Sequence, residues 1–441
     1  MTRQTLPTLS ERTVTASGPA YLAVIFLFSL LVPIVIPIGS LQLMPHRIVL
    51  LVCFFPTLVM LLSSPDIKLI PSDWLIMGSS VWAALALIVN HGVSSTIEPI
   101  GIHMIEFLGA YMLGRTAIRT AEDFQTFVKA FLLLLIILLP FAALESLTKR
   151  PVLLDLIPQS IAATDTGERL GMRRAQTAFA HPILFGAFAS SALGLFWYII
   201  TPERTRALTA PLVAALTVFS LSTGAFISFV MQVIFIAWET IAHTIRRRWT
   251  YFGVGAIVAY FLIDLLSNRT PFHVLVTYAS FNSGSAYNRI LIWQYGTDNV
   301  WANPVFGLGL NDWVRPSWMS SSMDNFWLVI ATQYGLPAIA LFIAGVVTII
   351  RSVALRDFIQ EPIRRCQAGF LVSVGGIVIA GGTVHYWHGI MAFALFFFGS
   401  GGWIAKIDEQ SEDGAVETPL QSPERKLTYT RFPSKKPFAK D

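Results

Sequence analysis

Charged residues are scarce in this chain, at 13% of its 441 residues, whereas 54% of the residues are hydrophobic. No soluble domain of this size can bury so much apolar surface, so the bilayer must act as the solvent for much of the chain. The small net charge of +5 resides mainly in loops and in the C-terminal tail. It therefore bears on membrane orientation, and it gives no reason to expect a nucleic-acid partner.

Cysteine is almost absent. Cys53 lies in an apolar run and Cys366 in a basic segment, so we expect neither a disulfide nor a metal site from them. The small residues that would mark a signal-peptide cleavage site are lacking after the first apolar run. That run is therefore predicted to be an uncleaved first span.

Long apolar runs are abundant, and each span needs about 20 such residues. We predict an all-α polytopic membrane protein with about twelve transmembrane helices, near residues 20–39, 47–63, 74–91, 97–117, 124–145, 181–200, 208–221, 224–241, 251–267, 324–350, 366–384 and 388–405. The seventh and eighth spans meet at Ser222-Thr223-Gly224 and could also be read as one broken span. Counting them separately keeps the basic run Arg246–Arg248 and most other cationic residues on the cytoplasmic side.

This topology divides the chain into a membrane domain and two cytoplasmic ends. It predicts an N-terminal tail over 1–19 and a transmembrane helical domain over 20–407. Two outer loops interrupt that domain, at 146–180 and at 268–323, and the larger one lies between the ninth and tenth spans. The tail over 408–441 is rich in proline, serine and charge, and it is predicted to be disordered.

Arginine is unexpectedly frequent in the outer loops, since membrane proteins usually keep it on the cytoplasmic side. Guanidinium binds phosphate in bidentate fashion and keeps its proton. Arg289 is the strongest candidate, because it lies in an apolar run from Ser285 to Trp293 that is predicted to be helical. Its anionic partner is either a phosphorylated, sugar-bearing lipid, a nearby carboxylate, or a headgroup reached by snorkelling. The remaining candidates for binding a diphosphate are Arg173, Arg174, Arg269 and Arg315, and the carboxylates that could pair with Arg289 are Asp298, Asp312 and Glu168.

Two further polar residues lie where predicted spans begin on the same outer face. Asp324 is either a general base that takes a proton from a sugar hydroxyl, or a helix cap, a role that a preceding serine could also fill. His181 precedes Pro182, and it either contacts a phosphate or sugar or caps its helix. The aromatic and amide candidates for sugar contacts are Tyr287, Trp293, Trp313 and Asn325, although the loop tryptophans could equally anchor the loop at the headgroups.

Two other sets of polar residues have weaker claims. His385 and His388 have a spacing that could suit a metal, but without nearby cysteines or carboxylates an aromatic belt explains them as well, so no metal site is predicted. Glu106 follows His103 in the middle of the fourth predicted span. An intramembrane carboxylate is costly, so it indicates either a transport site or a buried hydrogen-bonded pair.

The order of several short motifs between about 170 and 350 resembles that of the O-antigen ligase and Wzy-type polysaccharide polymerase superfamily. These motifs are Arg173-Arg174 ahead of His181-Pro182, the break Ser220-Leu221-Ser222-Thr223-Gly224, Ser285 and Arg289 before Trp293, the turn with Pro304, Gly307 and Gly309, and Asp324-Asn325 before Tyr334-Gly335-Leu336-Pro337. The resemblance implies a GT-C-like membrane glycosyltransferase. Its donor would be a glycan on undecaprenyl diphosphate, and transfer would invert the anomeric centre without a metal or other cofactor.

The same resemblance implies roles for particular residues. The family uses outer-loop arginines for the diphosphate, which maps onto Arg289, and by position Asp324 would be the catalytic base. Ligases of the family commonly carry histidine-asparagine where this chain has Asp324-Asn325, and many carry an arginine where it has Thr223. Both departures favour a polymerase of exopolysaccharide, capsule or O-antigen over a ligase that transfers to a lipid A-core acceptor.

The resulting prediction is an enzyme of the bacterial inner membrane with its active site facing the periplasm. Its partners would be an undecaprenyl-diphosphate-linked oligosaccharide, membrane lipids and other proteins of polysaccharide export. The alternatives are the ligase, a transporter or flippase centred on Glu106 and His103, and a non-catalytic scaffold that would tolerate loss of Arg289.

Overall fold

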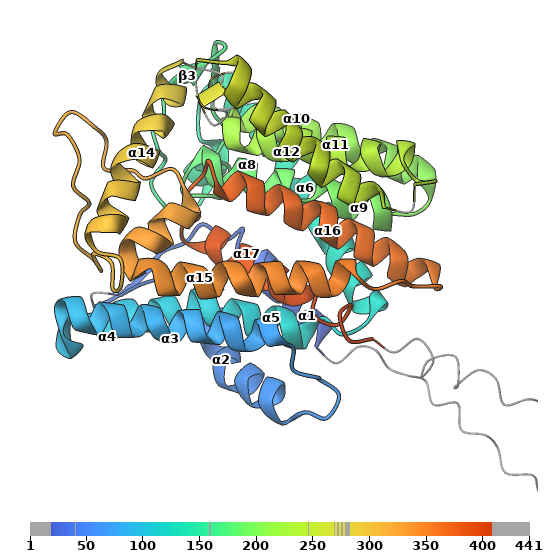
Figure 1. The fold of residues 1–441 in the computed structure, drawn as a ribbon, viewed down its shortest axis with the longest axis horizontal. Helices are drawn as coiled ribbons and strands as arrows, with labels where there is room; N and C mark the ends of the chain where they lie inside the picture. The colour runs from blue at the N-terminus through green and yellow to red at the C-terminus, as the bar shows by residue number, and fades with distance from the viewer. Residues whose placement is uncertain are drawn as a thin grey trace, which may run out of the picture. The chain divides into compact units, whose positions relative to one another are not determined.

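The computed structural model describes residues 19–407 apart from 40, 158–159, 246, 269, 271–272, 275–276 and 278–282. Helices dominate this part of the chain (Figure 1), in the order α1 Ala20–Ser29, α2 Pro45–Ser63, α3 Pro71–His91, α4 Val93–His103, a π-helical segment Met104–Gly109, α5 Ala110–Ala117, α6 Ala121–Thr148, α7 Val152–Leu156, α8 Pro182–Ser190, α9 Leu193–Ile199, α10 Glu203–Ser220, α11 Thr223–Ile241, α12 Arg248–Leu266, α14 Ser283–Ala302, α15 Phe326–Ala354, α16 Glu361–Gly381 and α17 Gly389–Ser400. The predicted tails over 1–19 and 408–441 fall almost entirely outside the described residues.

The only strands among these residues form two short antiparallel hairpins, which the all-α prediction did not include. They are β1 Ile36–Ile38 with β2 Leu41–Leu43, and β3 Glu168–Arg169 with β4 Met172–Arg173. Neither hairpin provides a core. The second one matters more, because it carries two of the outer-loop arginines.

Within the described residues, eight helices are long and apolar enough to cross a membrane: α2, α3, α6, α8 with α9, α11, α12, α15 and α16. None of the residues of α12 is buried by the rest of the chain, although the helix is strongly apolar. A surface of this kind is stable only against lipid. The protein is therefore a multi-pass membrane protein, whereas the number of twelve spans remains a prediction.

The first predicted span, 20–39, is wrong in its second half. Helix α1 ends at Ser29, and residues 36–38 form strand β1 instead. Pro33 and Pro37 explain the difference, because proline has no N–H to donate and clashes with the preceding helical turn. The ten residues of α1 reach only about 15 Å, roughly half of a bilayer core.

The break predicted between the seventh and eighth spans is present. Helix α10 ends at Ser220 and α11 begins at Thr223, and between them Leu221 has a left-handed backbone with φ 45°. A helix end of this kind leaves backbone carbonyls without helical partners. Here the free carbonyls at the end of α10 become acceptors for side chains of the candidate site.

Helix α15 bends where the turn Pro304–Gly309, which precedes it in the chain, packs against it. Gly335 has φ 84° inside the helix, and the amides of Leu308 and Gly309 donate to the carbonyls of Thr332 and Gln333 at 2.8 and 2.9 Å. The motif Pro304–Gly309 is therefore a tight turn, as the sequence indicated. Helix α3 packs along α15 (Figure 1) and also holds this turn, since Trp82 Nε1 donates to the Val305 carbonyl at 3.2 Å.

Gly335→Ala should destabilise the protein and disturb the outer loop. A Cβ at Gly335 would lie 2.1 Å from the Val305 carbonyl oxygen, and the positive φ adds strain. Backbone strain alone costs about 1–3 kcal/mol, so the melting temperature in detergent should fall. Gly253→Ala is the matched control, because a Cβ at that position of α12 meets nothing within 4 Å. Equal melting temperatures for the two variants would contradict this account of the bend.

Candidate functional site

Two arginines of the first outer loop are held by the free carbonyls at the end of α10. Arg169 donates to the Leu221 carbonyl at 2.8 Å, and Arg174 donates to the Ser220 carbonyl at 3.4 Å. The C-terminal end of a helix carries a partial negative charge that favours nearby cations. The broken-span motif thus has a structural role, which is to position two guanidinium groups.

The same loop is tied to α14, the helix of the second outer loop. Arg169 also donates to Ser285 Oγ at 3.3 Å, and Arg289 lies one helical turn after Ser285 on α14. The hydrogen bond between Arg169 and Ser285 therefore holds this end of α14, with Arg289, beside the β3–β4 hairpin. The prediction that Ser285 to Trp293 is helical is confirmed.

The carboxylate of Asp324 faces this group from the residue before the cap of α15. Burial lowers the pKa values of Arg174 and Arg289, and the negative charge of Asp324 partly opposes this effect. Two of the carboxylates that could pair with Arg289 have other partners: Glu168 pairs with Lys149 at 2.7 Å, and Asp312 pairs with Arg315 at 2.7 Å. We call Arg169, Arg174, Arg289 and Asp324 the arginine cluster.

The arginine cluster has more positive than negative charge. Burial, together with the charges of Arg169 and Arg289, lowers the pKa of Arg174 to about 10, despite the favourable effect of Asp324. Arg174 is only 5% exposed and remains charged near neutral pH. Among the described residues, three guanidinium groups around one carboxylate leave an excess of positive charge, and binding a polyvalent anion would relieve it.

Two histidines border the arginine cluster. Burial and the charge of Arg174 lower the pKa of His181 to about 4, and burial lowers that of His385 to about 4 although Asp324 opposes this. His181 caps α8, since its Nδ1 accepts from the amide of Ile183 at 3.1 Å. With Nδ1 accepting, the neutral ring carries its proton on Nε2, which can donate to a ligand.

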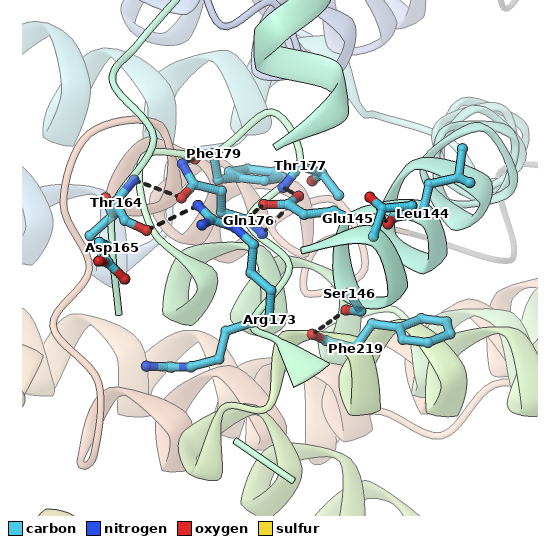
Figure 2. A network of polar contacts seen from close by, with 12 residues as sticks. Leu144, Glu145, Ser146, Thr164, Asp165, Arg173, Gln176, Thr177, Phe179 and Phe219 are labelled. Atoms are coloured by element: carbon cyan, nitrogen blue, oxygen red, sulfur yellow. Dashed lines mark hydrogen bonds and ion pairs between the residues drawn. The ribbon is translucent and has the colours of Figure 1, made fainter. Parts of the chain in front are cut away.

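Arg173 lies apart from its neighbour Arg174. It forms an ion pair with Glu145 at 3.5 Å and donates to the Thr164 carbonyl at 3.3 Å. Glu145 also accepts from the amides of Gln176 and Thr177, at 3.2 and 2.8 Å, and this network appears in Figure 2. Arg173 therefore braces the first outer loop against α6, and its guanidinium is already paired.

Arg315 is also engaged elsewhere. It pairs with Asp312 at 2.7 Å and its guanidinium lies 5.3 Å from the ring centre of Trp313. Its neighbours thus belong to the second outer loop alone. Arg269, the last of the predicted diphosphate ligands, lies outside the described residues.

The four predicted sugar contacts lie in different surroundings. Tyr287 and Trp293 are 59% and 47% exposed on α14. Trp313 is buried at 7% and lines a cavity in the second outer loop. Asn325 is 4% exposed, and its Oδ1 accepts from the amide of Leu328 at 3.1 Å, so it caps α15.

The structure corrects the prediction that Asp324 or a preceding serine caps α15, because Asn325 does so. Asp324 instead accepts from Ser322 Oγ at 2.8 Å. Its carboxylate has no capping role and remains available for other contacts.

Sequence reasoning missed Arg169 and His385 as members of this site. Arg169 lies four residues ahead of the Arg173-Arg174 pair, and only the hairpin turn at Gly171, with φ 74°, brings it back beside Arg174. His385 lies far from Asp324 in sequence. Its position in the turn between α16 and α17 could have indicated that it lies on the same side of the membrane domain as Asp324.

Glu106 forms a buried hydrogen-bonded group, as one of the two interpretations held, but with other partners than His103. Arg47 pairs with it at 2.6 Å and His46 lies 3.2 Å away. His103 instead stacks on Phe107, with ring centres 4.9 Å apart. Because Arg47 balances the charge of Glu106, burial of this carboxylate needs no transported ion.

The family comparison covers the centre of the site. Residues 207–343 match the family model described as O-antigen ligase, a stretch that includes the α10–α11 break, Arg289 and Asp324. No curated protein matches the chain. The match over residues 207–343 agrees with the resemblance of motif order to the O-antigen ligase and Wzy-type superfamily.

Proposed function

We propose that this protein is a membrane glycosyltransferase that polymerises a bacterial exopolysaccharide, capsule or O-antigen. The arginine cluster carries the proposal, since Arg169, Arg174 and Arg289 gather around the carboxylate of Asp324. A lipid-linked diphosphate is an anion suited to such a cluster. The donor in this proposal is a glycan chain on undecaprenyl diphosphate.

In the proposed reaction, Asp324 accepts the proton of a hydroxyl on the incoming lipid-linked repeat unit. The hydroxyl oxygen attacks the anomeric carbon of the donor from the face opposite the diphosphate, so the configuration inverts. The bond from that carbon to the diphosphate oxygen breaks, and its electron pair leaves with the diphosphate. Arg289 and its neighbours stabilise the developing negative charge, a type of catalysis that depends on donors fixed in advance.

The proposal includes the orientation of the chain. The arginine cluster faces the periplasm from the bacterial inner membrane, and the loops over 146–180 and 268–323 are periplasmic. The segments 1–19 and 408–441 are cytoplasmic tails. The excess of lysine and arginine on the opposite side supports this orientation, and the overall architecture would be GT-C-like.

Transfer to a lipid A-core acceptor is the second candidate, favoured by the description of the matching model as O-antigen ligase. Asp324 in place of histidine and Thr223 in place of arginine favour the polymerase. A transporter or flippase has less support, because Glu106 is neutralised by Arg47. A scaffold would not need a carboxylate among three arginines.

The length profile of surface glycan in a strain without this protein separates the candidates. We expect single repeat units to remain on the lipid carrier at the outer face, because polymerisation is lost. Long chains that accumulate on the carrier without attachment would indicate a ligase. Repeat units retained at the cytoplasmic face would indicate a flippase. Unchanged glycan would contradict all three.

A further inference from the structure

A cavity of about 320 Å³ lies between the second outer loop, the first turns of α15 and the turn before α17. Its wall includes Ser322 and Met323, the two residues before Asp324, and also His385. Ser322 Oγ donates to Asp324 at 2.8 Å. The cavity therefore adjoins the carboxylate on the side that the second outer loop and the turn before α17 provide.

The cavity is built by a braced loop. Trp313 lines it and donates from Nε1 to the Ser321 carbonyl at 3.0 Å. Arg315 pairs with Asp312, packs on Trp313 and donates to the Met319 carbonyl at 3.4 Å. Arg315 thus acts as a positioning residue for the cavity wall, which explains why it is not part of the arginine cluster.

The chemistry of the lining differs from that of the arginine cluster. The described lining residues include an aromatic ring, amides and hydroxyls, one carboxylate and no lysine or arginine. Polar and aromatic groups on this wall belong to Asn311, Asp312, Trp313, Ser322, Gln333 and His385. Amides and hydroxyls both donate and accept, which matches sugar hydroxyls. Asp312 is already paired with Arg315 at 2.7 Å, so the described lining offers an anion no additional positive charge.

The volume also fits a small ligand, since ligand sites usually have about 300 Å³ or more, with aromatic walls and a few polar groups. A diphosphate would meet no lysine or arginine among the described residues of this wall. The donor diphosphate and the cavity ligand are therefore chemically distinct. Asp324 is linked to the cavity through its hydrogen bond with the lining residue Ser322.

We propose that this cavity binds an uncharged sugar residue of the acceptor and holds its hydroxyl toward Asp324. The inference rests on the proposed function, which it deepens by separating an acceptor subsite from the donor subsite. It assigns a neutral sugar, not a uronic acid or a phosphorylated sugar, to the acceptor position. It also assigns Gln333 and Asn311 a role in acceptor affinity and none in diphosphate binding.

The test uses the full-length protein in lipid nanodiscs, with lipid-linked repeat units isolated from a strain that lacks it. The soluble acceptor is the repeat oligosaccharide released from its carrier by mild acid. Gln333→Ala and Asn311→Ala should each raise the KM for this acceptor roughly three- to tenfold, the effect of one lost hydrogen bond. The KM for the lipid-linked donor should not change. The backbone carbonyl of Gln333, which binds Gly309, is unaffected by Gln333→Ala.

Gln294→Ala on the exposed side of α14 is the matched control and should leave both KM values unchanged. Methyl glucoside should inhibit elongation more strongly than methyl glucuronide. If neither variant changes the acceptor KM while wild-type protein elongates, the acceptor site is wrong and the proposed function stands. Equal inhibition by the two glycosides would overturn the neutral-sugar assignment. If wild-type protein elongates nothing, the proposed function itself fails.

Discussion

Arg289→Ala should reduce glycan transfer about 10²–10³-fold, the usual effect of removing one donor that stabilises transition-state charge. Arg289 contributes a guanidinium beside Asp324 and Arg169. In the proposed reaction, its loss removes a bidentate contact with the departing diphosphate, whereas Arg169 and Arg174 remain to bind the ground state. We therefore expect kcat to fall more than KM rises, measured as polymer formed from lipid-linked repeat units.

Arg289→Lys separates charge from geometry. Lysine keeps the positive charge but cannot provide the planar pair of donors, so about a tenfold loss is expected in place of the full one. Arg204→Ala, at an exposed arginine of α10, is the control and should have no effect. Polymer of normal length and amount in Arg289→Ala, at normal protein levels, would refute the role of the arginine cluster.

Most of the architecture could be predicted, because apolar runs of bilayer length have few alternatives. The break at Ser222 was visible as two spans too short to stand apart, and the structure confirms it with the left-handed Leu221. The prediction of the first span was wrong because Pro33 and Pro37 do not interrupt an apolar run. Proline nevertheless ends a helix, since it has no backbone N–H to donate.

The candidate site was predictable in part. Arg174, His181, Arg289 and Asp324 were each singled out from the sequence, and the structure brings them together. The choice between Arg173 and Arg174 was not predictable, because one residue along a strand reverses the side on which a side chain lies. The same limit applies to Asp324 and Asn325, where only the backbone at the start of α15 decides which side chain caps it.

Which residue of each neighbouring pair faces the site decides what a substitution there would test. Since Arg173 is paired with Glu145, a variant at Arg173 would test loop stability more than diphosphate binding. Since Asn325 is the cap, a variant at Asp324 can change chemistry without shortening the helix. The roles assigned from the sequence can therefore be tested separately at neighbouring positions.

Asp324→Asn should lower kcat about 10²–10⁴-fold, the usual contribution of a general base. The amide has nearly the same shape but cannot take the proton of the attacking hydroxyl. It also removes the negative charge that faces Arg174 and Arg289, so the lipid-linked diphosphate should bind more tightly and its KM should fall. A simple counter-ion role predicts a different result, namely a lower melting temperature with kcat retained.

Asn325→Ala is the matched control for this variant. It removes the cap of α15 and should cost about 1 kcal/mol of stability, with kcat close to that of the wild type in the folded fraction. The two neighbouring variants should thus separate, one losing turnover with its melting temperature kept and the other losing stability with turnover kept. If Asp324→Asn retains turnover, the proton of the acceptor must leave by another group, and His385 beside the acceptor cavity is then the residue to replace next.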